Sequence, residues 1–408
     1  MKKIFLYTIL LCCLTLVSCQ SASDTHTQHS PAPTPKPAES LPASQPSASP
    51  SESPVESPAE SAEPSKKPAP VCQAAVQRIL PNGDVILSCT YSKLVKKKIR
   101  PLDIISLESD TVSLQIPVCY KASDVNLRSP FLCVNSDSEQ VSLSMNIGKF
   151  AKQYDVSRNT TFTLQRLQKN GYAREYQAHQ YTVTDSRNDY KTDTTFANFR
   201  EIHTTGIAPK TLYRGGNPLG YLKSPNRPRY SARLIQKYQI GSALNLANTR
   251  QEIKNFFQTT TSPYYKKLWE QGNIFTGHVT TDLYSDEFMD GVVPALRFML
   301  HAPKPYYIHC NMGKDRTGFL CAILEALMGA SYDEIVEEYM ISFENLLGVK
   351  KASEHWEILA DGNIRAILNG TFVSQDADRQ NLSEAAADYL KEHGMDDDEI
   401  EKLKQILS

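Results

Sequence analysis

The sequence predicts an α/β domain over residues 186–370, preceded by a small all-β domain over residues 71–185. Three observations lead to this fold class. The earlier region holds short β-rich runs separated by turn residues. Around residue 310, an apolar strand, a tight loop and an apolar helix follow one another, as in an α/β unit. The composition shifts near residue 70, because 12 of the 24 prolines lie between residues 21 and 70.

The N-terminal region indicates export and a tether. Lys2 and Lys3 precede an apolar run over residues 4–17, which is shorter than the roughly 18 residues of a membrane-spanning helix. The run ends at Leu-Val-Ser-Cys19, which resembles the lipobox of bacterial lipoproteins. This resemblance implies a signal peptide over 1–18, a lipidated Cys19 and a location on the extracytoplasmic face of the cell membrane. Replacing Cys19 with alanine is then expected to release a soluble form.

Residues 19–70 are rich in Ser, Pro, Ala and Glu and contain no aromatic residue. Such a segment cannot bury enough apolar surface to offset the entropy of ordering, so we expect a disordered tether. The whole chain has 44 Lys and Arg against 45 Asp and Glu, a formal net charge of −1. This balance argues against a nucleic-acid backbone as the main partner.

The region over 71–185 is expected to be a small β-sandwich or barrel of unknown role. Pro81-Asn82-Gly83-Asp84 predicts a hairpin turn between two strands, and four further short strands follow up to Met145. Outside the cytoplasm, four cysteines favour at least one disulfide, whose pairing the sequence leaves open. These cysteines are Cys72, Cys89, Cys119 and Cys133.

The chemistry is concentrated in the loop between a strand at 306–308 and a helix that carries Phe319 and Leu320. Unpaired backbone N–H groups and the positive end of the helix dipole make such a junction an anion site. Cys310 opens the loop as a candidate nucleophile, and Arg316 closes it with a planar fork that fits two phosphate oxygens. Gly313 lets the backbone turn its amides inward. Thr317 could hydrogen-bond the Cys310 sulfur and help it leave a phosphoenzyme.

His309-Cys310-Asn311-Met312-Gly313-Lys314-Asp315-Arg316-Thr317-Gly318 resembles the signature of cysteine-dependent protein tyrosine phosphatases. The form with Lys-Asp in the loop is typical of a bacterial branch with tyrosine and lipid phosphatase activity. The resemblance extends over residues 190–370, where 196–200, 212–216 and 240–252 look like the opening strands and 332–348 like a helix pair. It implies a phosphatase with a cysteinyl-phosphate intermediate, phosphate bound by residues 311–316, His309 beside the nucleophile, and neither a metal nor an organic cofactor.

The general acid has two candidates. Phosphate-ester cleavage needs a proton for the departing oxygen. Asp282 lies 28 residues before Cys310, close to the spacing of the acid in the family, and is the first choice. Asp315 is the alternative, because in the Lys-Asp branch that aspartate is itself implicated as the acid.

The substrate remains open between a phosphotyrosine protein, which is favoured, and a phosphoinositide or inositol polyphosphate. Tyr213, Tyr221 and Tyr284 could wall a deep slot, whereas a basic mouth could come from Lys314, Arg214, Arg227, Arg229 and Arg233. A non-catalytic, phosphate-binding or adhesive lipoprotein is the rival from another class. Residues 371–408 are expected to form two amphipathic helices, with Gly394 ending the first and Asp396 capping the second.

Overall fold

The described part of the chain in this computed structural model comprises residues 70–408 except 221–222, 260–261 and 374–380. The expected signal peptide, the lipidation site Cys19 and the tether therefore lie outside the described residues. The described residues belong to one compact unit. No helix among them combines the length and the apolar character needed to cross a membrane.

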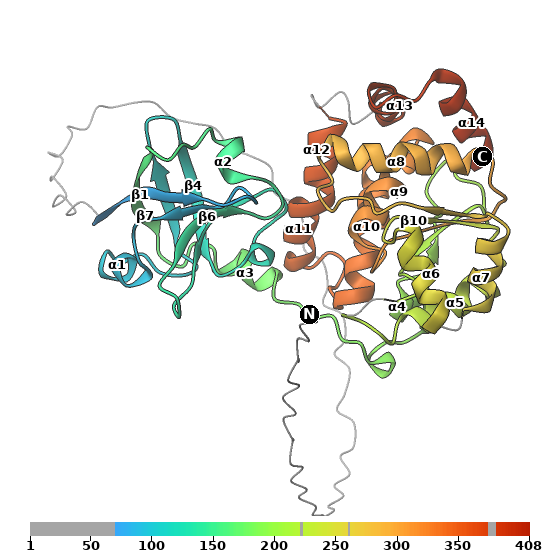
Figure 1. The fold of residues 1–408 in the computed structure, drawn as a ribbon, viewed down its shortest axis with the longest axis horizontal. Coiled ribbons are helices and arrows are strands. Elements are labelled where there is room, and N and C mark those ends of the chain that lie inside the picture. Colours follow the sequence, from blue (N-terminus) through green and yellow to red (C-terminus); the bar gives the residue numbers. More distant parts are fainter. Residues whose placement is uncertain (1–69, 221–222, 260–261, 374–380) are drawn as a thin grey trace, which may run out of the picture. The chain divides into compact units, whose positions relative to one another are not determined.

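The N-terminal part is a closed β-barrel with the strand order β1-β2-β6-β5-β4-β3-β7 (Figure 1). The expected hairpin is present, and Gly83 has the positive φ of 87° that its turn requires. The last strand, β7, was not among the expected strands, and its pairing with β1 closes the barrel. The strands are β1 (Val71–Ile79), β2 (Val85–Leu87), β3 (Ile104–Glu108), β4 (Ser113–Cys119), β5 (Pro130–Val134), β6 (Val141–Met145) and β7 (Thr161–Gln168).

Alternation along the strands fills this barrel. In β1, Cys72, Ala74 and Val76 are buried while their neighbours are exposed, as a strand with one face on the core requires. The region is not purely β, because short helices accompany the strands. They are α1 (Tyr91–Lys96), η1 (Ala122–Asp124), α2 (Phe150–Gln153) and α3 (Ala173–Ala178).

The expected disulfide is absent, because Cys72, Cys89, Cys119 and Cys133 are all free thiols in this structure. They nevertheless form two neighbouring pairs. Cys119 and Cys133 are partners across β4 and β5. Cys72 and Cys89 form the second pair, and the hydrogen bond between their thiols lowers the pKa of Cys72 and raises that of Cys89.

The C-terminal part is built on a five-stranded sheet in the order β11-β10-β12-β9-β8. Three of its four pairings are parallel, and the fourth, between β8 and β9, is antiparallel. Strands β9, β10 and β12 are buried at every position, as in parallel sheets covered on both faces. The strands are β8 (Arg200–Glu201), β9 (Leu212–Gly215), β10 (Ser242–Asn245), β11 (Ile274–Thr276) and β12 (Tyr306–His309).

Helices cover both faces of this sheet. Successive residues of a strand point to opposite faces, so Ile308 belongs to one hydrophobic core and its neighbour Tyr307 to another. The first core contains α8 (Asp286–Met299), α9 (Asp315–Leu327), α10 (Tyr332–Leu347), α11 (Glu354–Ala360), the π-helical turn η3 (Asp361–Arg365) and α12 (Ala366–Thr371). The second contains residues from α4 (Asp193–Ala197), α5 (Pro228–Lys237), α6 (Arg250–Thr259) and α7 (Pro263–Glu270).

Two expectations for this region were wrong. Phe196 and Ala197 lie in α4 rather than in an opening strand, because Thr192 caps a helical turn before them. Residues 332–347 form one helix rather than a helix pair, since Ser331 and Glu334 make a capping box at its start and the turn at Gly348 ends it.

The two C-terminal helices, α13 (Leu382–Glu392) and α14 (Asp397–Leu407), are confirmed, and Asp396 caps the second. They share the first core with α8 and α9. Arg297 of α8 also forms an ion pair with Glu399 at 2.6 Å. The helices are therefore packed into the α/β region rather than appended to it.

Candidate active site

The phosphate-type loop occupies the carboxyl end of β12, the central strand of the parallel sheet, where α/β folds place their ligand sites. Cys310 is 4% exposed and lies between β12 and the first turn of α9. Gly313 has a φ of 68°, and a β-carbon there would lie 2.2 Å from the carbonyl oxygen of Gly215. Glycine is thus required at this position by both backbone conformation and space.

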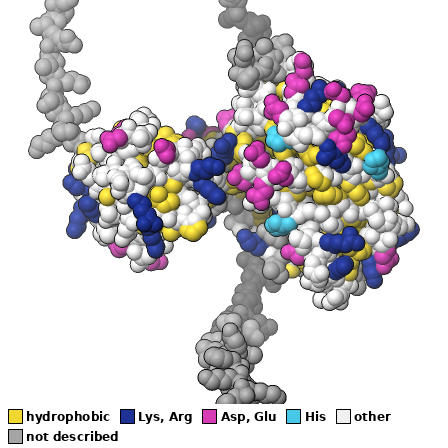
Figure 2. Space-filling view, turned by 45° about the horizontal axis from the view of Figure 1, so that its top comes forward, with side chains coloured by type: hydrophobic (Ala, Val, Ile, Leu, Met, Phe, Trp, Pro, Cys, Tyr) yellow, Lys and Arg dark blue, Asp and Glu magenta, His cyan; other side chains and the backbone are white. Residues whose placement is uncertain are grey.

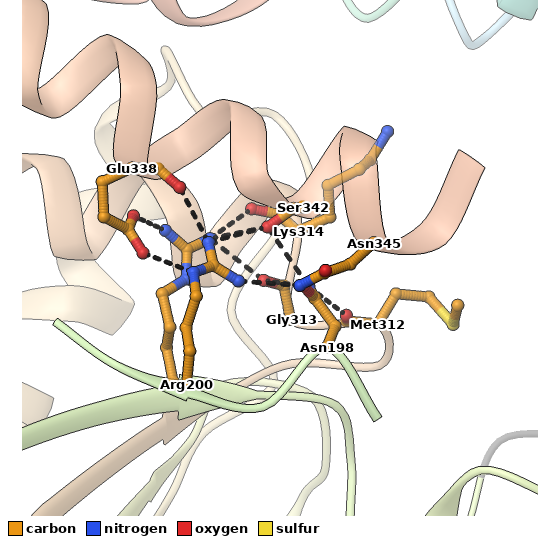
Figure 3. Close-up of polar contacts among 9 residues, drawn as sticks. Asn198, Arg200, Met312, Gly313, Lys314, Glu338, Ser342 and Asn345 are labelled. Carbon is orange, nitrogen blue, oxygen red and sulfur yellow. Dashed lines mark hydrogen bonds and ion pairs between the residues drawn. The ribbon is translucent and has the colours of Figure 1, made fainter. Parts of the chain in front are cut away.

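Buried donors fix the direction of the loop's carbonyl groups (Figure 3). Asn198 Nδ2 donates to the carbonyls of Met312 at 3.1 Å and Gly313 at 3.2 Å. Arg214 Nη2 donates to the carbonyls of Gly313 at 3.0 Å and Lys314 at 3.2 Å. In a trans peptide, C=O and N–H point in opposite directions. The amides that follow these carbonyls are therefore turned away from the donors, as an anion-binding loop needs.

A buried ion cluster holds these donors in place. Glu338 of α10 pairs with Arg200 Nε at 2.6 Å and Arg214 Nη1 at 2.5 Å. Arg200 also donates to the side-chain oxygen of Asn198 at 2.9 Å. Burial alone would raise the pKa of Glu338, but the two guanidinium groups outweigh it and hold that pKa below its usual value. The loop geometry thus rests on charges that the solvent does not screen.

Two backbone carbonyl groups hold the guanidinium of Arg316. Its Nη1 donates to the backbone carbonyls of Leu246 and Val279, both at 2.9 Å, and the residue is 5% exposed. These carbonyls follow the neighbouring strands β10 and β11. The guanidinium is therefore oriented by the sheet edge beside Cys310, a fixed position suited to two phosphate oxygens.

His309 is a positioning residue rather than a group open to substrate. It is fully buried, its Nε2 is 2.8 Å from the hydroxyl of Tyr265, and its ring stacks on Tyr307. Burial lowers its pKa to about 3, so the imidazole is neutral near pH 7. It fixes the strand end from which Cys310 projects.

Thr317 does not make the expected bond to Cys310 in this structure. Its hydroxyl is buried and has no hydrogen-bond partner. The first turn of α9 directs it into the protein next to the loop. An orphan hydroxyl of this kind is costly, which is consistent with a partner that it acquires only during the reaction.

Cys310 opens onto a cavity of about 600 Å³. Six residues of the loop line this cavity, and all but Met312 are polar or charged. They are Cys310, Asn311, Met312, Lys314, Asp315 and Arg316. The rest of the lining is largely apolar and includes Val125, Leu127, Ile147, Ala178, Tyr181, Phe343, Leu347 and Leu359. The site therefore combines a phosphate-sized anion loop with an apolar wall.

The two candidate acids occupy different cavities. Asp315 lines the Cys310 cavity, and its carboxylate is 3.3 Å from Lys314 Nζ. Asp282 lines the adjacent cavity instead, where its side chain accepts a hydrogen bond from the amide of Tyr284. Asp282 does not line the Cys310 cavity, because its loop turns the carboxylate into its own Asx-type turn, and the choice between the two acids stays a prediction.

Most of the expected basic mouth is not at the cavity. Arg214 is fully buried beneath the loop, and Arg227 lies over the rings of Tyr190 and Phe196. Arg229 and Arg233 stack on Tyr230 of α5. Lys314 does line the cavity, with its ammonium 4.5 Å from the Phe343 ring centroid.

The expected tyrosine walls are absent as well. Tyr213 is buried in the second core, and Tyr284 lines the adjacent cavity. Tyr221 lies outside the described residues. Tyr181, which the sequence did not single out, lines the Cys310 cavity instead and hydrogen-bonds His355 at 2.8 Å.

Sequence reasoning missed several site residues. Asn198, Glu338 and Ser342 support the loop from elements far away in the chain (Figure 3). His179 lines the cavity, and burial lowers its pKa to about 4. In the sequence these residues appear as single polar residues, and their partners in the fold cannot be read from the neighbouring residues. Within the described residues, no three His, Cys, Asp or Glu side chains are arranged to hold a metal ion.

A strand, a Cys-x5-Arg loop and a buried helix N-terminus together define a cysteine-dependent phosphatase type of site. Residues 280–408 match a family model described as the tyrosine phosphatase family. In these residues the chain is similar to that family. The match contains the loop and the C-terminal helices but not the barrel. No curated protein sequence matches the chain.

Two solved structures show weak similarity. One is an uncharacterized conserved protein from Thermotoga maritima, with a TM-score of 0.23 and 14% identity over 25% of this chain. The alignment covers 39% of that protein's length. The other is the core catalytic domain of the PP-IP phosphatase SIW14 from S. cerevisiae, with a TM-score of 0.21 and 20% identity over 42% of this chain and 95% of that chain.

Proposed function

We propose that this protein is a phosphatase that hydrolyses phosphate monoesters, with phosphotyrosine in proteins as the favoured substrate, through a cysteinyl-phosphate intermediate. The observation that carries the proposal is the loop itself: Cys310 and Arg316 flank backbone whose carbonyls are held outward by Asn198 and Arg214. A location on the outer face of the membrane, anchored through Cys19, is part of the proposal and is supported by the sequence alone.

In the first step, the Cys310 thiolate attacks phosphorus while the bond between phosphorus and the substrate oxygen breaks. Arg316 and the loop amides stabilise the equatorial oxygens of the transferring group. We assign the proton donor for the leaving oxygen to Asp315, since it lines the same cavity as Cys310. In the second step, Asp315 takes a proton from water, the water oxygen bonds to phosphorus, and the Cys310 thiolate leaves.

The lining of the cavity favours an aryl phosphate. Apolar side chains face the loop, so the ring of a phosphotyrosine loses water-exposed surface on entry. An inositol polyphosphate requires several cations, whereas the cavity adds only Lys314 to Arg316 and also contains Asp315. Figure 2 likewise shows Lys and Arg interspersed with Asp and Glu over the visible face rather than gathered on one basic surface.

The substrate class is tested with the purified protein in EDTA. We expect kcat/KM for phosphotyrosine peptides to exceed that for phosphoserine peptides, phosphoinositides and inositol hexakisphosphate, because only the long aromatic side chain reaches a thiol that is 4% exposed. Vanadate should inhibit the reaction. Preferential hydrolysis of inositol hexakisphosphate or phosphoinositides would instead support the second candidate, for which Lys314 in the cavity is the favouring observation.

The acid assignment predicts different results for two variants. Asp315→Asn is expected to lower kcat/KM, which reports the first step, about 10²- to 10⁴-fold for substrates with poor leaving groups. The effect should be smallest for p-nitrophenyl phosphate, whose leaving group needs little protonation, and the alkaline limb of the rate profile should disappear. Asp282→Asn serves as the matched control and should stay within a few-fold of wild type. If Asp282→Asn shows the leaving-group dependence and Asp315→Asn does not, the two assignments must be exchanged.

A further inference from the structure

The barrel supplies part of the lining of the catalytic cavity, although it lies outside the region matched by the family. Six lining residues come from the β4–β5 connection and from the segment after β6. These residues are Ala122, Ser123, Val125, Leu127, Asn146 and Ile147. Among them, Leu127 also packs against the first core of the α/β region.

A backbone hydrogen bond joins this part of the barrel to the α/β region. The amide of Leu127 donates to the carbonyl of Gly362 in η3 at 3.2 Å. A β-carbon on Gly362 would lie 1.9 Å from the side-chain oxygen of Asn126, so a larger residue there would displace the Asn126 side chain. The same Asn126 oxygen is 2.9 Å from His179 Nε2. The cavity wall is therefore fixed by specific contacts rather than by loose association.

Ile147 is held in an unfavourable backbone conformation at this wall. Its φ is 63°, in the left-handed region that β-branched residues avoid. Glycine or asparagine would adopt this conformation at lower cost. The residue is half-buried and lines the cavity. Local strain of this kind is often stored at ligand sites.

A second cavity of about 710 Å³ adjoins the first. Three segments contribute to both cavities, with neighbouring residues lining one or the other. They are 127–128, 146–149 and 280–282. The barrel contributes cations to the second cavity and the α/β region contributes acids. The cations are Arg128, Lys149 and Lys152, and the acids are Asp282, Asp286 and Glu287. Arg128 also lies over the Tyr284 ring at 4.4 Å.

We propose that the barrel is one half of the substrate site and that the two adjoining cavities form a groove for a phosphorylated polypeptide. Leu127 and Ile147 contact the ring of the phosphorylated residue, and the second cavity receives the residues that flank it. This inference rests on the proposed function. A polypeptide is the occupant that fits, because side chains of both charges can pair with this mixed lining, whereas a polyphosphate would meet three carboxylates there.

The first test uses Ile147→Gly, with Asp155→Gly as the matched control. Asp155 is an exposed barrel residue with a φ of 48° that lines neither cavity. Because glycine accepts the left-handed conformation, the relief of backbone strain offsets the greater freedom of the unfolded chain, and both variants should keep a melting temperature near that of wild type. For Ile147→Gly, we expect the ratio of kcat/KM for a phosphotyrosine peptide to that for acetyl phosphate to fall about tenfold. Asp155→Gly should leave that ratio unchanged.

A charge reversal tests the second cavity. Lys152→Glu should lower kcat/KM for a phosphotyrosine peptide with acidic flanking residues relative to one with basic flanking residues, by about tenfold. Free phosphotyrosine, which has no flanking residues, reports the effect on the catalytic cavity alone.

The outcomes separate this inference from the proposed function. No hydrolysis of acetyl phosphate or phosphotyrosine by the wild-type protein would refute the function itself. Hydrolysis with equal losses on the peptide and on acetyl phosphate in Ile147→Gly would refute the barrel's role alone. A Lys152→Glu effect on phosphoinositide vesicles, with none on peptides, would replace the polypeptide by a lipid head group and overturn the proposal.

Discussion

Replacing Cys310 with serine is expected to lower kcat by about four to six orders of magnitude, the range seen when an enzyme loses its nucleophile. A serine hydroxyl is far less nucleophilic than a thiolate, and His309, which is buried and bonded to Tyr265, is not placed to activate it. Binding should persist, so Cys310→Ser should still retain vanadate or substrate. The measurement is steady-state hydrolysis of p-nitrophenyl phosphate.

Cys321→Ala is the matched control for this loss. Cys321 is fully buried in α9 eleven residues further on and does not line the catalytic cavity. Burial raises the pKa of its thiol, so it is not available as a nucleophile. Activity should stay within a few-fold of wild type in Cys321→Ala. Activity that survives in Cys310→Ser would rule out Cys310 as the nucleophile. A wild-type protein that binds phosphate but hydrolyses none of these substrates would favour the rival hypothesis, in which the loop binds phosphate without turnover.

Replacing Glu338 with glutamine is expected to cost about 3–5 kcal/mol of unfolding free energy, because it leaves two buried guanidinium groups without a counter-charge. Arg214 and Arg200 are both held by this carboxylate. Their displacement would release the carbonyls of Gly313 and Lys314, so kcat should fall as well. Chemical denaturation followed by tryptophan fluorescence gives the first quantity, and hydrolysis of p-nitrophenyl phosphate gives the second.

The neighbouring Glu337→Gln is the control for this substitution. Glu337 pairs with Lys351 at 2.9 Å, but both side chains are 56% exposed. An exposed pair contributes about 0–1 kcal/mol. Equal effects of the two substitutions would show that the buried cluster does not support the loop.

The contribution of Glu338 should also depend on pH. Its pKa is lowered in the folded protein, so the stabilisation is present above the usual pKa of a glutamate and is lost as the pH falls through the lower folded value. The difference in stability between wild type and Glu338→Gln should therefore shrink in acid. A difference that grows in acid would mean that the folded pKa is raised.

The sequence predicted those elements that depend only on neighbouring residues. The hairpin at Gly83, the strand before Cys310 and the cap at Asp396 each depend on a few adjacent residues, and all are present. The barrel closure could not be predicted, since it depends on the pairing of β1 with β7, which lies about ninety residues later. The role of Arg214 was wrong for a similar reason. Its partner Glu338 is 124 positions away in the chain, and a basic residue without a visible partner suggests a surface site.

In the site, too, features set by one loop could be predicted, and features that depend on distant residues could not. The spacing of Cys310 and Arg316 follows from one loop, whereas the cavity wall opposite it comes from a different fold region, at Leu127 and Ile147. Spacing alone also favoured Asp282 as the acid. The direction in which its loop turns the carboxylate is set by hydrogen bonds within residues 280–285, and these place it in the adjacent cavity.

The central claim is that phosphate passes through the sulfur of Cys310. The most direct measurement is rapid acid quenching of Asp315→Asn protein during turnover of labelled p-nitrophenyl phosphate, followed by proteolysis and mass spectrometry. Without Asp315 to activate water, the second step is slowed and the intermediate should accumulate. We expect labelled phosphate on the peptide that contains Cys310, and none in protein that also carries Cys310→Ser. Label on a histidine, aspartate or serine, or turnover with no labelled protein at any time, would contradict the mechanism.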